Sequence, residues 1–274
     1  MGEASRKLEG ATLQSLLSLV KTHTGITMEE RKSTLLSGRI GRRLRVLGLE
    51  TPEQYLEYLQ NTSEETQEFV NVVTTNETVF FRTPIVWNYF INEFLPEWNS
   101  KNPGATLRIW SAASSSGEEA CTIAMSCEEF KVQNAQFRYR IYGSDISTEV
   151  LEKAKSGIYR GRSMDEFKIK FPERYAKFFE TQSDGSAKLQ SALLNNIEYS
   201  THNLHRRAPK SEFYDIVFLR NVLIYFNDVD QELVLQNIYG SVKKNGILIL
   251  GESESLSRFK ASFNFVQPLI YKKG

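Results

Sequence analysis

The chain has little cysteine and no apolar run long enough to cross a bilayer. Its two cysteines, Cys121 and Cys127, are too few for a disulfide framework, and a reducing compartment is the simplest inference. No apolar stretch reaches the ~18–20 residues that a membrane-spanning helix needs, and the N-terminal residues lack the apolar core of a secretory signal. We therefore expect a soluble, cytoplasmic protein without direct membrane insertion.

Several ligand signatures are also missing. The Gly-x-Gly-x-x-Gly fingerprint is absent, which disfavours an NAD-dependent dehydrogenase. His202 and His205 have no evident third partner, so no metal site is predicted. The formal net charge is only +1, so affinity for nucleic acid or membranes would need a local patch, and no nucleic-acid partner is expected. The sequence contains no long apolar helix surface of the kind that would indicate an obligate dimer, so we expect a monomer.

The composition fits an ordinary globular protein, with 41% hydrophobic and 24% charged residues among 274. Residues 1–72 are predicted to form a small all-helical domain, because apolar residues recur at helical spacing. One helix is expected at 28–47, and another one or two between 50 and 73, where six glutamates occur without any lysine or arginine. Charge therefore segregates by helix within this domain.

The helix expected at 28–47 carries a basic face. The face includes four arginines close together in the sequence: Arg39, Arg42, Arg43 and Arg45. One interpretation is a solvated surface, which is the usual explanation for a charged helix face. The other is a docking face for an acidic helix or groove.

From residue 107 onward, strand patterns alternate with helix patterns. Strands are expected at 107–111, 139–144, 196–200, 214–219, 246–251 and 263–271, and helices around 118–130, 148–156 and 229–242. This alternation predicts an α/β domain over 107–274, with a mostly parallel, Rossmann-like sheet. Pro268 suits a hairpin or bent edge strand at the end. Residues 157–195 break the rhythm and are interpreted as an inserted small β-subdomain with a hairpin, and residues 73–106 as a helical junction.

Residues 107–119 describe a strand, a loop of small residues and a helix that opens with Glu118 and Glu119. Small side chains let a ligand approach the backbone, and a helix N-terminus offers unpaired N–H groups. Two carboxylates would repel a pyrophosphate and suit a ligand with a positive charge and hydroxyls, such as a sulfonium nucleoside. The alternative is an ordinary β–α turn whose glutamates complement the helix dipole.

Ligands of open α/β sheets bind beyond the carboxyl ends of the strands, so residues after each strand are candidates. Asp145 could accept hydrogen bonds from ribose hydroxyls, or it could cap the next helix. Asn203 and Leu204 could face an adenine, the former through its side chain or backbone, and Asn221 and Tyr225 would then face the reacting centre.

A polar segment precedes the first strand and ends in paired aromatics and an arginine. It could form a lid or wall that presents Asn76, Thr78 and Arg82. Alternatively, Thr75 or Asn76 caps a helix, and the two phenylalanines after them belong to the core.

Six motifs in unbroken order resemble the chemotaxis receptor methyltransferases, the CheR family. They are residues 74–82 (Thr-Thr-Asn-Glu-Thr-Val-Phe-Phe-Arg), 110–119 (Trp-Ser-Ala-Ala-Ser-Ser-Ser-Gly-Glu-Glu), 144–154 (Ser-Asp-Ile-Ser-Thr-Glu-Val-Leu-Glu-Lys-Ala), 156–159 (Ser-Gly-Ile-Tyr), 218–226 (Phe-Leu-Arg-Asn-Val-Leu-Ile-Tyr-Phe) and 251–254 (Gly-Glu-Ser-Glu). The resemblance implies an S-adenosylmethionine-dependent enzyme that esterifies glutamates on the cytoplasmic helices of chemoreceptors. It also implies a helical domain before a Rossmann-like catalytic domain with an inserted β-subdomain.

The resemblance also implies roles for individual residues. It places Arg82 and Tyr225 nearest the transferred methyl group and makes the arginine-bearing helix the receptor-docking helix. In some members the inserted subdomain binds a tethering pentapeptide of the receptor, but the turn at 182–187 is short here, so we expect no tether. The implied cofactor residues are Asn76, Thr78, Arg82, Glu119, Asp145, Asn203, Leu204, Arg220 and Asn221.

Two rival functions can be weighed on the same residues. A nitrogen methyltransferase would use an Asn-Pro-Pro-Tyr turn, whereas Val222-Leu223-Ile224 separates Asn221 from Tyr225 here. A non-catalytic cofactor-sensing module would not need Arg82 and Tyr225, and both are present.

Overall fold

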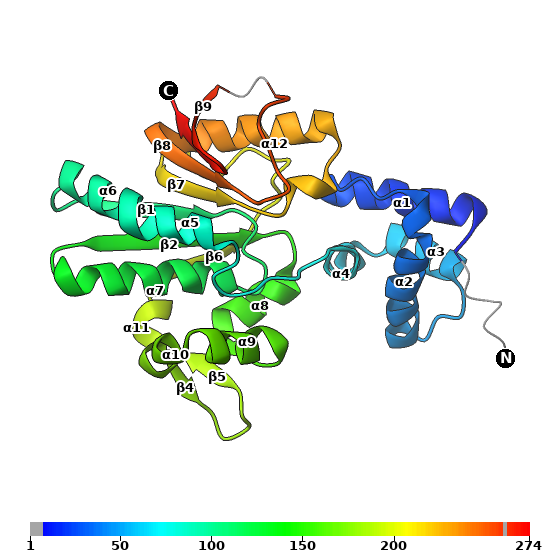
Figure 1. Cartoon of the computed structure of the whole chain (residues 1–274). Helices are drawn as coiled ribbons and strands as arrows, with labels where there is room; N and C mark the ends of the chain where they lie inside the picture. Colours follow the sequence, from blue (N-terminus) through cyan, green and yellow to red (C-terminus); the bar gives the residue numbers. More distant parts are fainter. Residues whose placement is uncertain (1–7, 260–261) are drawn as a thin grey trace.

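Four amphipathic helices form the N-terminal domain in the computed structural model, which describes residues 8–259 and 262–274 (Figure 1). They are α1 (Gly10–Thr24), α2 (Ser33–Leu47), α3 (Pro52–Asn61) and α4 (Ser63–Val73). Their apolar faces meet in one core that includes Leu16, Leu36, Ile40, Tyr55 and Phe69. The predicted all-helical domain is therefore confirmed.

Local signals set the ends of these helices. Gly25 and Gly48 adopt left-handed backbone angles that close α1 and α2, with φ of 76° and 69°. Thr51 and Gln54 form a capping box at α3. The helix expected from residue 28 begins later, because a 3-10 turn at Glu30–Lys32 precedes α2.

A seven-stranded sheet forms the second domain, in the order β6-β2-β1-β7-β8-β10-β9. The first five strands in this order are parallel, and β10 is antiparallel both to β8 and to β9, with which it forms the final hairpin. The strands are β1 (Thr106–Ser111), β2 (Arg138–Asp145), β6 (Ile197–Thr201), β7 (Tyr214–Leu219), β8 (Val242–Leu250), β9 (Phe263–Gln267) and β10 (Ile270–Lys273). The expected parallel sheet and its terminal hairpin are both present.

Helices cover both faces of this sheet. Side chains alternate along β1, so that Ile109 joins the core beneath α7 and Trp110 joins the core beneath α12. The helices are α7 (Glu118–Gln133), α8 (Thr148–Ser156), α12 (Asp228–Ser241) and a continuous helical segment made of α5 (Pro84–Tyr89), a π-helical turn (Phe90–Phe94) and α6 (Leu95–Lys101). This segment packs in the same core as α7, and its Trp87 stacks on Phe218 of β7.

The inserted segment forms a separate three-stranded antiparallel sheet, in the order β3-β5-β4 (Figure 1). Its elements are β3 (Ile158–Tyr159), α9 (Arg162–Lys170), α10 (Pro172–Phe178), β4 (Phe179–Thr181), β5 (Ala187–Leu189) and α11 (Ser191–Leu194). Its aromatic residues pack on Phe80 and Phe81, with ring centroids 4.8 Å apart for Phe80–Phe167 and for Phe81–Phe171. The two phenylalanines thus belong to the core, as one alternative expected.

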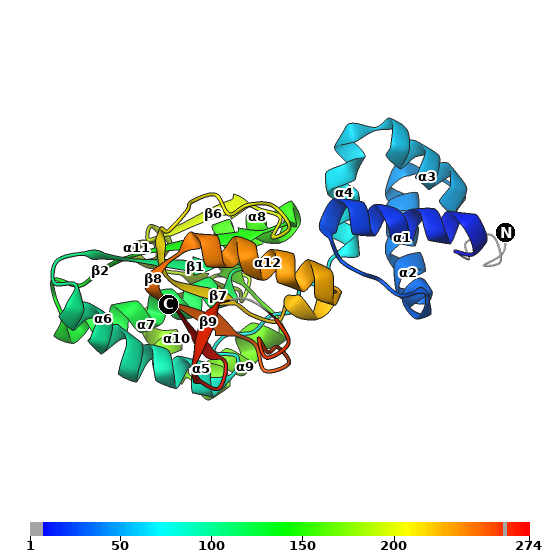
Figure 2. The same ribbon diagram turned by 90° about the horizontal axis from the view of Figure 1, so that it is seen from above.

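The helical domain lies at one end of the α/β domain, as Figures 1 and 2 show from two directions. The Asn203 side chain donates to the carbonyl of His23 at 3.0 Å, and the Thr27 N–H donates to the carbonyl of Tyr225 at 2.9 Å. A Cβ on Gly25 would overlap the ring of His205, so the connection after α1 sits directly on the second domain. Within the described ranges, none of the helices combines the length and apolar character needed to cross a bilayer.

Candidate functional site

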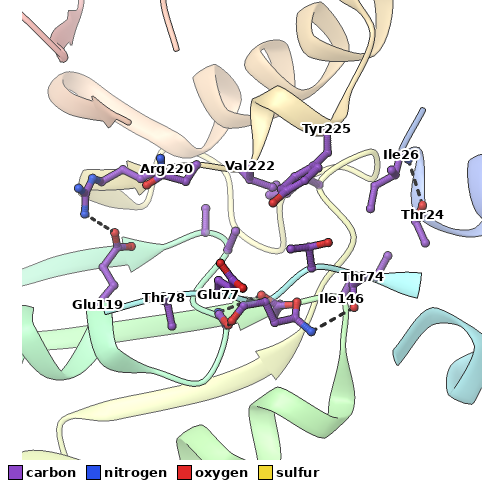
Figure 3. Close-up of a pocket in the computed structure, with 18 of the residues that line it drawn as sticks. Thr24, Ile26, Thr74, Glu77, Thr78, Glu119, Ile146, Arg220, Val222 and Tyr225 are labelled. Carbon is purple, nitrogen blue, oxygen red and sulfur yellow. Dashed lines mark hydrogen bonds and ion pairs between the residues drawn. The ribbon is translucent and has the colours of Figure 1, made fainter. Parts of the chain in front are cut away.

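A cleft of about 890 Å³, open mouth included, lies at the carboxyl ends of β1, β2, β6 and β7. Thr24 and Ile26, from the end of α1 and the connection that follows it, form one side, and Figure 3 shows them across the cleft from the Arg220–Glu119 pair. The cleft brings together every cofactor and catalytic residue that the sequence suggested: Asn76, Thr78, Arg82, Glu119, Asp145, Asn203, Leu204, Arg220, Asn221 and Tyr225.

Glu119 and Arg220 form a buried ion pair at one end of the cleft. The Arg220 Nη1 lies 2.9 Å from the Glu119 Oε2, and the Ser111 hydroxyl donates to the Glu119 Oε1 at 2.7 Å. The Arg220 Nη2 donates to the carbonyl of Arg82 at 2.7 Å. The Arg220 Nε is buried and has no partner among the described residues. Two of the five guanidinium N–H groups therefore have protein partners among the described residues, and three donors remain unpaired.

Glu118 does not line this cleft. It accepts a hydrogen bond from the Ser116 hydroxyl at 2.7 Å, and burial raises its pKa. Of the two glutamates that open α7, only Glu119 lines the cleft, where it is paired with Arg220. The expectation that both carboxylates face the ligand is therefore wrong.

Asp145 ends β2 and fixes the loop of small residues after β1. Its carboxylate accepts from the backbone N–H groups of Ser115 at 2.9 Å and Ser147 at 3.0 Å. Burial raises the pKa of Asp145, and these backbone hydrogen bonds oppose the shift. The N-cap of α8 is Ser147, so Asp145 is not the cap. A carboxylate has about four acceptor positions, which leaves acceptor capacity for a ligand.

Asn203 uses its side chain to join the two domains. Besides its hydrogen bond to His23, its Oδ1 accepts from the N–H of His205 at 3.0 Å. Both ends of the amide therefore have protein partners, which favours the backbone over the side chain for reading an adenine. Leu204 is buried, and its carbonyl accepts from the Asn237 side chain at 2.9 Å.

The segment after β7 presents Asn221 and Tyr225. Asn221 has a left-handed backbone with φ of 57°, and Tyr225 closes a 3-10 turn at Leu223–Tyr225. The carboxylate of Glu254 accepts backbone hydrogen bonds from this segment. Sequence reasoning named the motif that contains Glu254 but assigned it no role. The strand-end rule applied to β8 would have drawn attention to it.

The segment between α4 and α5 forms another wall of the cleft. Ser115 donates to the carbonyl of Asn76 at 2.7 Å, and Trp87 donates to that of Arg82 at 2.8 Å. Neither Thr75 nor Asn76 caps a helix, because α4 ends at Val73 and α5 begins at Pro84. Arg82 also lines an adjoining groove beside α9, and its guanidinium forms no ion pair within the described part of the chain.

Two of the four arginines proposed for docking are not free on the surface. Arg39 is 9% exposed, donates to the carbonyl of Val73, and donates to the Thr75 hydroxyl at 2.8 Å. Arg43 holds Glu65 through two hydrogen bonds of 2.8 and 2.6 Å. These positions flank the buried stripe of α2, so their side chains reach inward. A four-arginine exposed face is therefore wrong, and only Arg42 and Arg45 are exposed.

Over residues 8–259 and 262–274, no group of three or more His, Cys, Asp or Glu is arranged to hold a metal ion. The lining of the cleft includes carboxylates, arginines, amides and a tyrosine.

Comparisons with known proteins cover both domains of the chain. Residues 76–271 match the family described as CheR methyltransferase, SAM binding domain, and residues 11–74 match CheR methyltransferase, all-alpha domain. A chemotaxis protein methyltransferase of Salmonella typhimurium is 34% identical over 270 residues, covering 96% of this chain and 90% of that protein. Proteins of the same name from Escherichia coli and Borreliella burgdorferi are 32% and 30% identical, covering 96% of this chain and 91% and 94% of theirs.

Proposed function

This chain belongs to the CheR methyltransferase family, and we propose that it methylates glutamate side chains on the cytoplasmic helices of chemoreceptors. The chain is an S-adenosylmethionine-dependent protein methyltransferase of the chemotaxis type. The proposed products are glutamate methyl esters and S-adenosylhomocysteine. The observation that carries the proposal is the gathering of Glu119, Asp145, Arg220 and Tyr225 around one cleft at the strand ends.

The cleft residues fit the parts of an adenosyl donor. Asp145 retains acceptor capacity for ribose hydroxyls after it has bonded Ser115 and Ser147. Leu204 offers an apolar surface for an adenine. Glu119 offers an acceptor to the amino group of the donor, and the guanidinium of Arg220, which lines the cleft, suits its carboxylate. We assign the walls formed by Asn76, Thr78, Asn203 and Asn221 to the same site.

S-adenosylmethionine supplies a methyl group activated by a sulfonium centre. The receptor glutamate is ionised at neutral pH, since its ordinary pKa is about 4.3, and needs no general base. A carboxylate oxygen forms a bond to the methyl carbon while the carbon–sulfur bond breaks and its electron pair stays on sulfur. The anion and cation both become neutral, so a dry and oriented cleft favours the reaction over water.

Arg82 and Tyr225 are the proposed catalytic residues. The guanidinium of Arg82 has no ion pair with the described residues, so it can guide an incoming carboxylate. Tyr225 is held from both sides, because Thr27 donates to its carbonyl and the turn before it is fixed by backbone hydrogen bonds. Its hydroxyl can then orient the acceptor oxygen or the methyl group.

We assign receptor docking to the exposed arginines of α2. Arg42 and Arg45 can attract a glutamate-rich receptor helix electrostatically, which speeds association, and dissolved salt screens this attraction. Arg39 and Arg43 hold α2 to the junction segment and to α4 instead. A cytoplasmic location follows from this substrate.

We also propose that the enzyme acts as a monomer and without a tethering pentapeptide. The hairpin between β4 and β5 turns within a few residues, since the N–H of Gln182 bonds the carbonyl of Ser186. Calorimetry with a receptor C-terminal pentapeptide should give no heat of binding. A tight complex would refute the second proposal, and a dimer in sedimentation would refute the first.

The function is tested with purified enzyme, labelled S-adenosylmethionine and a receptor cytoplasmic fragment. We expect label on receptor glutamates as base-labile esters, located by mass spectrometry. Label on nitrogen, or cofactor binding without any transfer, would overturn the proposal.

A further inference from the structure

Residues 221–223, which lead from β7 to Tyr225, have few supports within their own segment. β7 ends at Leu219, and the chain then turns through Asn221, whose φ of 57° is a backbone conformation that L side chains rarely adopt. The 3-10 turn Leu223–Tyr225 follows at once, and its first N–H groups have no earlier turn to bond. Some other group must therefore hold this segment in place.

The carboxylate of Glu254 meets that need with four backbone hydrogen bonds. Its Oε2 accepts from the N–H groups of Gly251 at 2.7 Å and Asn221 at 2.9 Å. Its Oε1 accepts from those of Val222 and Leu223, each at 2.8 Å. Glu254 is 7% exposed, so little water competes for these donors.

We infer that Glu254 is a positioning residue for catalysis, acting through the backbone that sets Asn221 and Tyr225. The identity of the reaction in this inference rests on the proposed function. The positioning role itself is argued only from the hydrogen bonds of Glu254. Glu254 is not among the residues that line the cleft, so its effect on the reaction is indirect.

The residue type at 254 follows from the donors that surround it. An ionised carboxylate is purely an acceptor with about four positions, and four N–H groups converge on it here. A glutamine would present an amide N–H₂ to some of these donors. The site also needs Gly251, because a Cβ there would lie 2.8 Å from the N of Asn221 and from the Glu254 Oε2.

The test compares Glu254→Gln with Glu254→Asp and with a control, Asp215→Asn. Asp215 is also a buried carboxylate, and it accepts from the N–H of Arg108 at 2.9 Å and from Lys243 at 2.7 Å. It lies near the start of β7, at the opposite end of the strand from the cleft. The control therefore reports the cost of losing a buried carboxylate without touching the segment after β7.

Three readouts separate positioning from stability: amide hydrogen exchange of the unliganded protein, S-adenosylhomocysteine affinity by calorimetry, and kcat with receptor fragment. In Glu254→Gln we expect faster exchange at residues 221–223 and 251. We also expect at least about a tenfold loss in both affinity and kcat, because buried N–H groups lose their partners. Glu254→Asp, which keeps the charge, should recover part of each loss. Asp215→Asn should change melting temperature but neither affinity nor kcat.

The inference is overturned if Glu254→Gln keeps the exchange protection, affinity and kcat of the natural protein. It is also overturned if Asp215→Asn reproduces the losses, since these would then reflect stability alone. Should Glu254→Gln fail to fold, Glu254→Asp decides on the same three readouts. If the natural protein binds S-adenosylhomocysteine but methylates no receptor, the proposed function fails. The hydrogen-exchange and affinity measurements then still test whether Glu254 positions the segment after β7.

Discussion

Reversing the charge of Arg42 and Arg45 tests receptor docking without touching the cofactor cleft. Both side chains are exposed on α2, whereas Arg43, between them in sequence, is bound to Glu65. An exposed ion pair contributes about 0.5 kcal/mol, and reversal replaces each attraction by a repulsion of similar size. Two reversals then cost about 2 kcal/mol, or about 30-fold in kcat/KM for the receptor.

The matched comparison is Arg43→Ala on the same helix. Its partner Glu65 is 4% exposed in its side chain and also accepts from the Tyr55 hydroxyl at 2.8 Å. Breaking a buried pair leaves an uncompensated charge, so we expect about 3 kcal/mol less stability against unfolding. In the folded fraction, kcat/KM should change by less than about threefold, since Arg43 does not face solvent as Arg42 does.

The assay follows methyl transfer to a receptor fragment at about 20 mM and about 200 mM salt, which spans the range over which exposed charges become screened. The natural enzyme should slow as salt rises, and the Arg42→Glu/Arg45→Glu variant should be slow and nearly independent of salt. S-adenosylhomocysteine affinity serves as the control and should not change. Unaltered transfer by the double variant at low salt would refute docking through these arginines.

Two further predictions concern the cleft. Arg82→Ala and Tyr225→Phe should each lower kcat by about tenfold or more, which is a typical effect for groups that act on the reacting atoms. Their affinity for S-adenosylhomocysteine, measured by calorimetry, should fall much less. Unchanged turnover in both variants would show that neither residue belongs to the reacting centre. Burial raises the pKa of Asp145, so its carboxylate is neutralised at a higher pH than an ordinary aspartate, and cofactor affinity should fall as pH falls through that raised pKa. The sign for stability is opposite, because a folded-state pKa above the unfolded value makes the unliganded protein more stable as pH falls through that window. Calorimetry and melting curves from pH 7 down to about pH 4 check both signs, and an Asp145→Asn variant should lose this component of the pH dependence.

Local sequence patterns predict much of the fold. β7 spans 214–219 and α8 spans 148–156, as predicted, because the apolar run 216–219 and a helix closed by Gly157 are strong local signals. The local pattern does not predict where the last helix ends and β8 begins. It assigns Val242 to the helix, whereas Val242 begins β8 because its pairing with Tyr214 decides its conformation.

The sequence predicts which residues line the cleft better than it predicts the hydrogen bonds and ion pairs that these residues form. Strand-end reasoning and resemblance chose residues that do meet in one cleft. Which of them are already partnered depends on residues far apart in sequence, such as Glu119 with Arg220 or Asn203 with His23. A helix pattern likewise does not say whether an arginine beside the apolar stripe turns inward, as Arg39 does.

The central claim is that this cleft binds an adenosyl donor through Asp145. The most direct test is calorimetric titration of the natural protein and of Asp145→Asn with S-adenosylhomocysteine. We predict one site per chain in the natural protein and at least about a tenfold weaker site in the variant, because a hydrogen bond to a charged group contributes about 1.5–3 kcal/mol. No binding to the natural protein, or equal affinity in the two, would contradict the account.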